Sequence, residues 1–273
     1  MVKVTKKDYY MDGYLKKNLD IANKAIRKDW DMVILVDGME GSGKSVMAQQ
    51  AAYYCDPSFN LKNIVFTPSE FKKEIMTAKK YTSIVYDEAY TGLSSRATMS
   101  MINRALVSML AEIRQRNLFV FVVMPTFFDL DKYVAIWRSR ALINLYTDGF
   151  NRGYFKFYSS SRKKELYVNG KKFYNYFKPE PNFRGRFTDF YTVDKEKYKR
   201  KKRDSLMDRE KKAEEALLRR EIEDAMFIRI MALPQAVKDK VQNNILAKVL
   251  GISESYYYIK LKKWEENRLL ESM

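Results

Sequence analysis

The 273-residue sequence contains no histidine and only one cysteine, Cys55. These absences exclude a disulfide within the chain, a zinc site built from cysteine and histidine, and histidine-based acid–base catalysis. The scarcity of cysteine favours a cytoplasmic location, the host cytoplasm if the protein is viral. Long apolar runs are missing as well. The longest, at 118–124, is too short to cross a bilayer, so we expect no membrane insertion, and we expect no signal peptide.

Acidic residues are few relative to basic ones, at 34 against 51, which gives a net charge of +17 and an isoelectric point near 9.6. The positive charge is concentrated between positions 162 and 203, where 15 basic side chains face 5 acidic ones. Such a surplus favours a polyanionic partner, nucleic acid first and an acidic membrane surface second. The alternative is a basic surface that has no such partner.

Residues 38–45 read GMEGSGKS, the complete G-x-x-x-x-G-K-S pattern of a phosphate-binding loop. The glycines let backbone N–H groups turn toward a polyphosphate, Lys44 reaches the β- and γ-phosphates, and the Ser45 hydroxyl ligates Mg²⁺. An apolar run at 32–36 precedes the loop and a helical stretch at 45–54 follows it, which places a helix N-terminus under the phosphates. We predict that ATP contacts Gly38, Met39, Glu40, Gly41, Ser42, Gly43, Lys44, Ser45 and Val46.

A second motif ends the apolar run at 83–86 with two carboxylates, Asp87 and Glu88. In ATPases with a phosphate-binding loop, the first acid at such a strand end holds Mg²⁺ and the second polarises the attacking water. We therefore predict Asp87 as a magnesium ligand together with Ser45, and Glu88 as the catalytic base. This assignment favours hydrolysis over transfer of phosphate to a small molecule.

Arginines end the helix predicted at 97–116, just before the strand predicted at 118–124. Arg114 and Arg116, with Arg104 behind them, are candidates for an arginine finger that reaches the γ-phosphate of a neighbouring subunit. The alternative is that these charges complement the helix dipole. After the strand, Thr126 is the polar group best placed to sense the γ-phosphate.

Apolar strands alternate with helical patterns from 30 to 148, which predicts an α/β core with a mostly parallel sheet. The strands are expected at 32–36, 63–66, 83–86, 118–124 and 141–146, and the helices at 44–55, 68–79 and 97–116. A helical lead-in is expected at 1–29 and an ATPase domain at 30–193. Within that domain the Asn169-Gly170 pair predicts a β-hairpin insertion at about 150–177.

The remainder of the chain is predicted to be helical, with a charged linker at 194–224 and a small module at 225–273. Ala247, Gly251 and Ser253 follow a helix–turn–helix pattern, as a close-packing residue, a turn residue and a helix cap. The next helix, at 254–265, is a candidate for contact with DNA. The alternative is a bundle for oligomerisation or partner docking. On the helix at 254–265, the candidate contact residues are Tyr256, Tyr257, Tyr258, Lys260, Lys262 and Lys263.

The order of these motifs resembles the FtsK–HerA superfamily of DNA-pumping ATPases, especially its compact viral and plasmid members and the Zot-like proteins of filamentous phages. The resemblance covers residues 30–148 and includes the segments FDLDK and WRSR that follow the strand at 118–124. Family members commonly place a glutamine where this chain has Met124-Pro125-Thr126. The resemblance implies a RecA/FtsK-like core, ATP and Mg²⁺ as cofactors, and a hexameric or pentameric ring that drives duplex DNA.

The leading hypothesis is an ATP-hydrolysing motor that packages or translocates viral or plasmid DNA, with a capsid portal or a replication protein as a further partner. One alternative is an AAA+-type helicase loader or replication initiator, and another is an ATP-switched assembly or export protein with negligible turnover. A small-molecule kinase is disfavoured by the charge and the Asp-Glu pair. The candidate DNA contacts are Arg152, Lys156, Arg162, Lys163, Lys164, Lys171 and Lys172.

Overall fold

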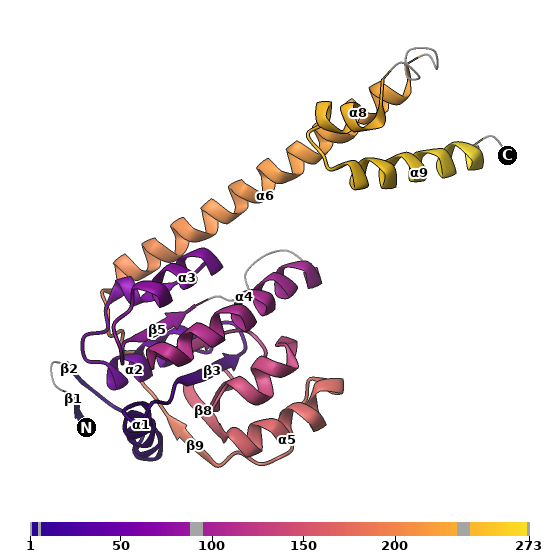
Figure 1. The fold of residues 1–273 in the computed structure, drawn as a ribbon. Coiled ribbons are helices and arrows are strands. Elements are labelled where there is room, and N and C mark those ends of the chain that lie inside the picture. Colours follow the sequence, from indigo (N-terminus) through magenta and orange to yellow (C-terminus); the bar gives the residue numbers. More distant parts are fainter. Residues whose placement is uncertain (1, 5–6, 88–94, 234–240, 272–273) are drawn as a thin grey trace. The chain divides into compact units, whose positions relative to one another are not determined.

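A computed structural model describes residues 2–4, 7–87, 95–233 and 241–271 of the chain. The chain divides into two compact units, residues 1–205 and residues 206–273 (Figure 1). Glu88, the predicted catalytic base, lies outside the described residues. No helix in the described ranges combines the length and the apolar character that a bilayer-spanning helix needs.

The first unit is built on a seven-stranded sheet with the order β4-β5-β6-β3-β7-β8-β9. The five strands from β4 to β7 in this order are parallel, and β8 and β9 are antiparallel additions at one edge. A separate antiparallel pair consists of β1 (Val2–Val4) and β2 (Lys7–Tyr9). The expected mixed α/β fold with a mostly parallel sheet is thus confirmed. The strands of the sheet are β3 (Met32–Gly38), β4 (Ile64–Val65), β5 (Ser83–Tyr86), β6 (Phe119–Val123), β7 (Ala141–Asp148), β8 (Asn151–Ser159) and β9 (Phe183–Arg186).

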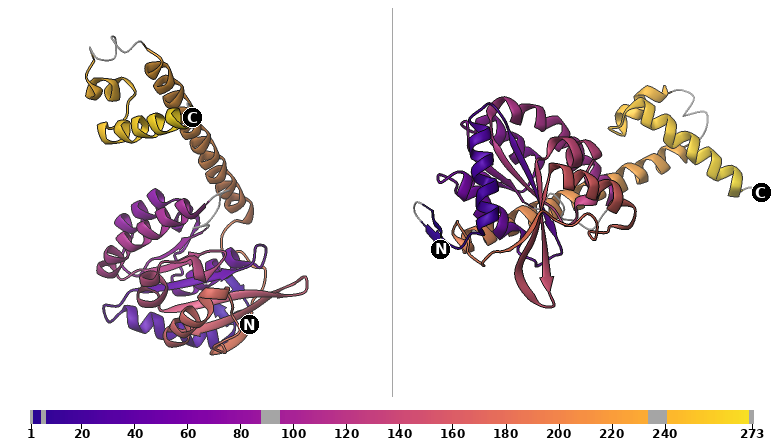
Figure 2. Two further views of the ribbon diagram at one scale, coloured as in Figure 1. Left: turned by 90° about the vertical axis from the view of Figure 1, so that its right-hand side faces the viewer. Right: turned by 90° about the horizontal axis from the view of Figure 1, so that it is seen from below.

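Helices cover both faces of the sheet (Figure 2), because the central strands are apolar on both sides. Along β3, Ile34 and Val36 pack with α1 (Gly13–Ile26) and α2 (Lys44–Cys55), whereas Val33 and Leu35 belong to the cluster on the other face. That second cluster includes side chains of α3 (Pro68–Thr77), α4 (Ser95–Arg116) and α5 (Ser160–Gly170). Short helical turns complete the unit: η1 (Leu61–Asn63), η2 (Phe127–Asp129), η3 (Tyr133–Arg138) and η4 (Lys171–Phe173).

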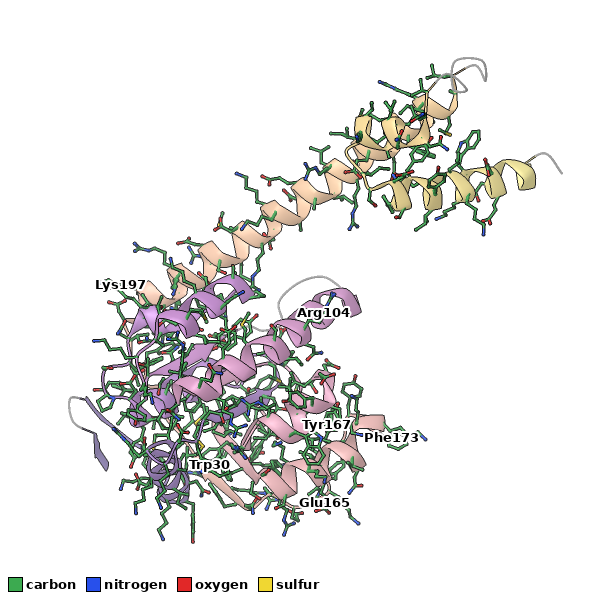
Figure 3. The ribbon with its side chains drawn as sticks, viewed as in Figure 1. Trp30, Arg104, Glu165, Tyr167, Phe173 and Lys197 are labelled. Carbon is green, nitrogen blue, oxygen red and sulfur yellow. The ribbon has the colours of Figure 1, made fainter. Side chains whose placement is uncertain are left out.

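The predicted hairpin insertion at 150–177 is wrong. Residues 151–159 form β8, which pairs with β7 around a turn near Gly149, and residues 160–170 form helix α5. Helical spacing overrides the Asn-Gly signal, since Lys163, Leu166, Tyr167 and Gly170 are all buried on one side of α5. Tyr167 is labelled on this helix in Figure 3. Gly170 has right-handed helical torsion angles and so cannot form a type I′ turn.

The second unit contains α6 (Lys195–Met231) from residue 206 onward, together with α8 (Asn243–Val249) and α9 (Glu254–Glu271). The expected helical module is present, and the predicted charged linker is part of α6. Gly251 has a φ of +68°, and the Ser253 Oγ accepts a hydrogen bond from Tyr256 N at 3.2 Å as a helix cap. The small core is formed by Phe227, Met231, Leu246, Ala247, Leu250 and Tyr257. Because Tyr257 is only 1% exposed, it is a core residue rather than a contact residue of α9.

Candidate functional site

The phosphate-binding loop joins the carboxyl end of β3 to the start of α2, at the edge of the sheet where the parallel strands end. Its three glycines, Gly38, Gly41 and Gly43, have φ angles of +138°, +77° and +96°. A Cβ atom on Gly38 would lie 2.3 Å from the carbonyl oxygen of Leu145, and one on Gly43 would lie 2.9 Å from Phe187 Cζ. Glycine is therefore required here by torsion angle and by space.

Lys44 folds back along the loop, and its Nζ donates hydrogen bonds to the carbonyl oxygens of Gly38 at 2.7 Å and Met39 at 2.8 Å. Burial lowers the pKa of Lys44, while the nearby carboxylates of Asp37, Glu40 and Asp87 act in the opposite direction. The loop residues and Lys44 thus combine an ammonium group with a helix N-terminus, which is the arrangement that binds a phosphate group.

Ser45 and Asp87 are adjacent although 42 positions separate them in the sequence. The Ser45 Oγ donates a hydrogen bond to Asp87 Oδ1 at 3.0 Å, and Asp87 is completely buried at the end of β5. Hydroxyl and carboxylate oxygens suit Mg²⁺, which usually takes one or two protein ligands and fills its remaining positions with water and substrate phosphate. Within the described ranges no three Cys, Asp or Glu side chains form a metal cluster.

Tyr198 completes this pair, and sequence reasoning missed it. Its phenol, on the first turn of α6, donates a hydrogen bond to Asp87 Oδ2 at 2.5 Å. Burial, followed by the charge of Asp87, raises the pKa of Tyr198, so the phenol stays protonated and remains a donor. The residue lies 111 positions from Asp87, in a charged segment whose composition carries no signal for a site.

Asp37, directly before the loop, is the second site residue that the motifs did not reveal. It is completely buried and accepts hydrogen bonds from Asn144 Nδ2 at 2.9 Å, Phe127 N at 2.9 Å and the Tyr176 hydroxyl at 2.5 Å. Burial raises the pKa of Asp37 to about 6, and these donors together with Lys44 limit the increase. An acidic residue inside an otherwise apolar strand was the available signal.

The segment between β9 and α6 lies along α2. Gln50 Nε2 donates hydrogen bonds to the carbonyl oxygens of Thr188 at 2.7 Å and Phe190 at 2.9 Å, and Phe187 packs on Gly43. Arg152 of β8 is also close to the loop, because a Cβ on Gly41 would lie 3.6 Å from its Nη2. One aromatic and one basic side chain, Phe187 and Arg152, thus lie beside the loop although both are distant from it in the sequence.

Comparisons with known proteins give a likeness to solved structures but no match to a described family. No family model matches the sequence, and no curated protein matches it. Among solved structures, the N-terminal domain of zonular occludens toxin from Neisseria meningitidis shows a likeness with 15% sequence identity and a TM-score of 0.35. The likeness covers 62% of this chain and 98% of that domain. At this level of similarity it carries no argument about function.

The other residues predicted for the site, Thr126, Arg114 and Arg116, do not all lie near the loop. Thr126 follows β6 at the same edge of the sheet as the loop, where its hydroxyl lies 3.3 Å from that of Tyr176 and caps η2. Arg116 and Arg114 end α4 before β6 begins. They therefore lie at the amino ends of the parallel strands, whereas the loop lies at the carboxyl ends. Arg116 Nη1 donates to the carbonyl oxygen of Ala78 at 3.4 Å, and Arg114 is exposed.

Lys163 is not a surface residue and cannot contact DNA, contrary to the expectation from its sequence context. Its Nζ donates hydrogen bonds to the carbonyl oxygen of Ala135 and, at 3.2 Å, to that of Ile136, so it caps carbonyl groups of η3. Among the other candidate contacts, Lys156 is half-buried on β8. The exposed members of the set are Arg152, Arg162, Lys164, Lys171 and Lys172.

Proposed function

We propose that this protein hydrolyses ATP with Mg²⁺ and uses the reaction to move nucleic acid, as a DNA-packaging or DNA-translocating ATPase of a virus or plasmid that acts as a ring oligomer. The observation that carries the proposal is the pairing of Ser45 with Asp87 beside the glycine loop, at 3.0 Å. A hydroxyl, a carboxylate, a lysine and a helix N-terminus that converge on one point form the set of groups that a Mg²⁺–nucleotide complex requires.

Each group of the site has its own role in the proposed reaction. The backbone N–H groups of the loop and Lys44 hold the phosphates, and Ser45 and Asp87 hold the metal. Bound Mg²⁺ would neutralise charge that develops on the phosphate oxygens. Glu88, next in sequence to Asp87, accepts the proton of the attacking water, and Arg114 or Arg116 of a neighbouring subunit stabilises the transition state. Thr126 lies at the same edge of the sheet and senses the terminal phosphate.

The nucleic-acid part of the proposal is supported by charge. The net charge is +17, and five of the candidate basic residues at 152–172 are exposed. Contacts of lysine and arginine with backbone phosphates release counterions, so binding to duplex DNA should weaken steeply as salt increases. The proposed ring encloses the DNA, and a capsid portal or a replication protein would be a further partner.

A replication initiator or helicase loader of AAA+ type is the second candidate. It is favoured by the C-terminal unit, in which the turn at Gly251 and the cap at Ser253 have the geometry of a helix–turn–helix. Such a protein would bind a particular sequence through α9. Loss of sequence-specific binding on deletion of residues 225–273 would support this candidate.

The deciding experiment measures ATP turnover with and without duplex DNA, together with particle mass by light scattering. We expect the wild type to hydrolyse ATP faster with DNA and to form a ring-sized oligomer, and we expect Lys44→Ala and Glu88→Gln to lose turnover. Lys62→Ala, at an exposed lysine on η1, is the control and should retain turnover. A monomer whose ATP turnover is the same with and without DNA would contradict the proposal of a motor. ATP binding without turnover would favour the ATP-switched assembly protein.

A further inference from the structure

Asp87 is held from two sides by two different elements. Its Oδ1 accepts the hydrogen bond of Ser45 from α2, at 3.0 Å, and its Oδ2 accepts that of Tyr198 from α6, at 2.5 Å. Each oxygen of the carboxylate therefore has its own donor, and the plane of the carboxylate is fixed. The oxygen that accepts from Ser45 is the one that shares the predicted metal position with the Ser45 hydroxyl.

Tyr198 is itself held firmly. Asp194 caps the first turn of α6 through a hydrogen bond from Lys197 N to Asp194 Oδ1 at 2.8 Å, and Figure 3 labels Lys197 at this end of the helix. The ring of Tyr198 lies between aromatic neighbours, with centroid distances of 6.1 Å to Phe66 and 5.8 Å to Tyr191. The residue is 3% exposed, so the phenol has little freedom to turn away from Asp87.

The helix that carries Tyr198 is anchored one turn further along. Lys201 Nζ donates hydrogen bonds to the carbonyl oxygens of Leu61 at 3.2 Å and Ile64 at 2.5 Å, at η1 and the start of β4. The preceding segment is fixed to α2 through Gln50. The position of the phenol is thus set by contacts on both sides of it in the sequence.

We propose that Tyr198 is a positioning residue for the magnesium site: its phenol holds Oδ2 of Asp87 so that Oδ1 stays directed, with Ser45, toward the metal. This inference rests on the proposed function of the loop as a Mg²⁺–ATP site. Groups that hydrogen-bond a metal-binding carboxylate orient it, and their loss typically weakens metal affinity by about 10- to 100-fold. Tyr198 does not need to touch either the metal or the nucleotide.

The test measures nucleotide binding without the metal and then the effect of adding the metal. Binding of a fluorescent ATP analogue is measured in EDTA and then during a titration with MgCl₂, for the wild type, Tyr198→Phe and Tyr9→Phe. Tyr9 is the matched control, because its buried hydroxyl donates to the carbonyl oxygen of Gln50 at 2.7 Å, on the same helix α2, but does not reach Asp87. Both variants lose one buried tyrosine hydrogen bond, so they should have similar melting temperatures.

We expect Tyr198→Phe to bind the analogue in EDTA as the wild type does, and to need about 10- to 100-fold more Mg²⁺ for half-maximal enhancement of binding. Tyr9→Phe should follow the wild-type magnesium curve. In an Asp87→Asn background, Tyr198→Phe should cause no further change, since the phenol acts through that carboxylate. A further increase in the magnesium requirement when Tyr198→Phe is added to Asp87→Asn would contradict the proposal.

Two other outcomes would overturn the inference. An unchanged magnesium requirement in Tyr198→Phe would mean that the hydrogen bond is only structural, and a lower requirement would mean that the phenol competes with the metal for Asp87. Failure of the proposed function gives a different result, because the wild type itself would then bind the analogue without any response to Mg²⁺.

Discussion

Asp37 lies one residue before the loop, and its carboxylate links three parts of the site. It receives hydrogen bonds from β7 through Asn144, from the first residue of η2 through Phe127 N, and from Tyr176. Its charge also lies close enough to Lys44 to favour the ammonium form. Because the burial of Asp37 disfavours its charged form, a proton on this carboxylate should affect the stability of the whole site.

The first prediction concerns the pH dependence that Asp37 produces. Its pKa is about 6 in the folded protein, above the ordinary 3.8, so the folded state holds the proton at a higher pH than the unfolded state does. The contribution of Asp37 to the free energy of unfolding therefore increases as pH falls from 7 toward about 4, by up to about 3 kcal/mol. In Asp37→Asn this increase should be absent. Urea unfolding of both proteins across this range tests it, and parallel curves would contradict it.

Helix α5 shows why an element can be misjudged from its sequence. The Asn169-Gly170 pair suggested a turn, yet the segment is a helix because Leu166 and Tyr167 lie on one buried face. Lys163 belongs to the same face and caps the carbonyl groups of η3. Lysine is expected at the surface from its residue type, but its long apolar stem can be buried while its amino group caps carbonyl groups.

The second prediction follows from that burial. Burial, and then the charge of Arg140, lower the pKa of Lys163 to about 7, so the folded protein releases this proton well before the unfolded chain does. The free energy of unfolding should therefore rise with pH between about 7 and 9.5, on the order of 3 kcal/mol from this residue. Lys163→Met should lose this rise. Lys164→Met, at the exposed neighbouring residue, should keep it, and a similar slope in both variants would contradict the assignment.

The strands and helices around the loop were predictable because their signals are local. The run 32–36, the loop and the helix after it are contiguous, and Asp87 directly follows an apolar strand. The position of Tyr198 depends on a contact across 111 residues, and that of Tyr176 beside Asp37 on one across 139. Such contacts arise from how α6 and the segment after α5 return to the sheet, and no periodicity in the sequence encodes that return.

Charge is distributed very unevenly between the two units. Residues 206–273 contain 13 basic and 12 acidic side chains, a net charge of +1, which leaves 38 basic and 22 acidic side chains, a net charge of +16, in residues 1–205. Nonspecific affinity for DNA depends mainly on the phosphates that lysine and arginine neutralise. The first unit should therefore supply nearly all of that affinity, although the helix–turn–helix geometry lies in the second.

The third prediction tests this division with a chain that ends after Ser205. The site residues described above, from Asp37 to Lys201, all lie within it, so it should bind the ATP analogue with Mg²⁺ as the full chain does. Its affinity for random duplex DNA should fall with salt along the same slope of log K against log salt concentration, because the phosphate contacts are retained. Fluorescence anisotropy at several salt concentrations measures the slope. A slope reduced by more than about one phosphate contact would contradict this division, because it would mean that basic residues of the second unit, such as Lys260, Lys262 and Lys263 of α9, also neutralise DNA phosphates.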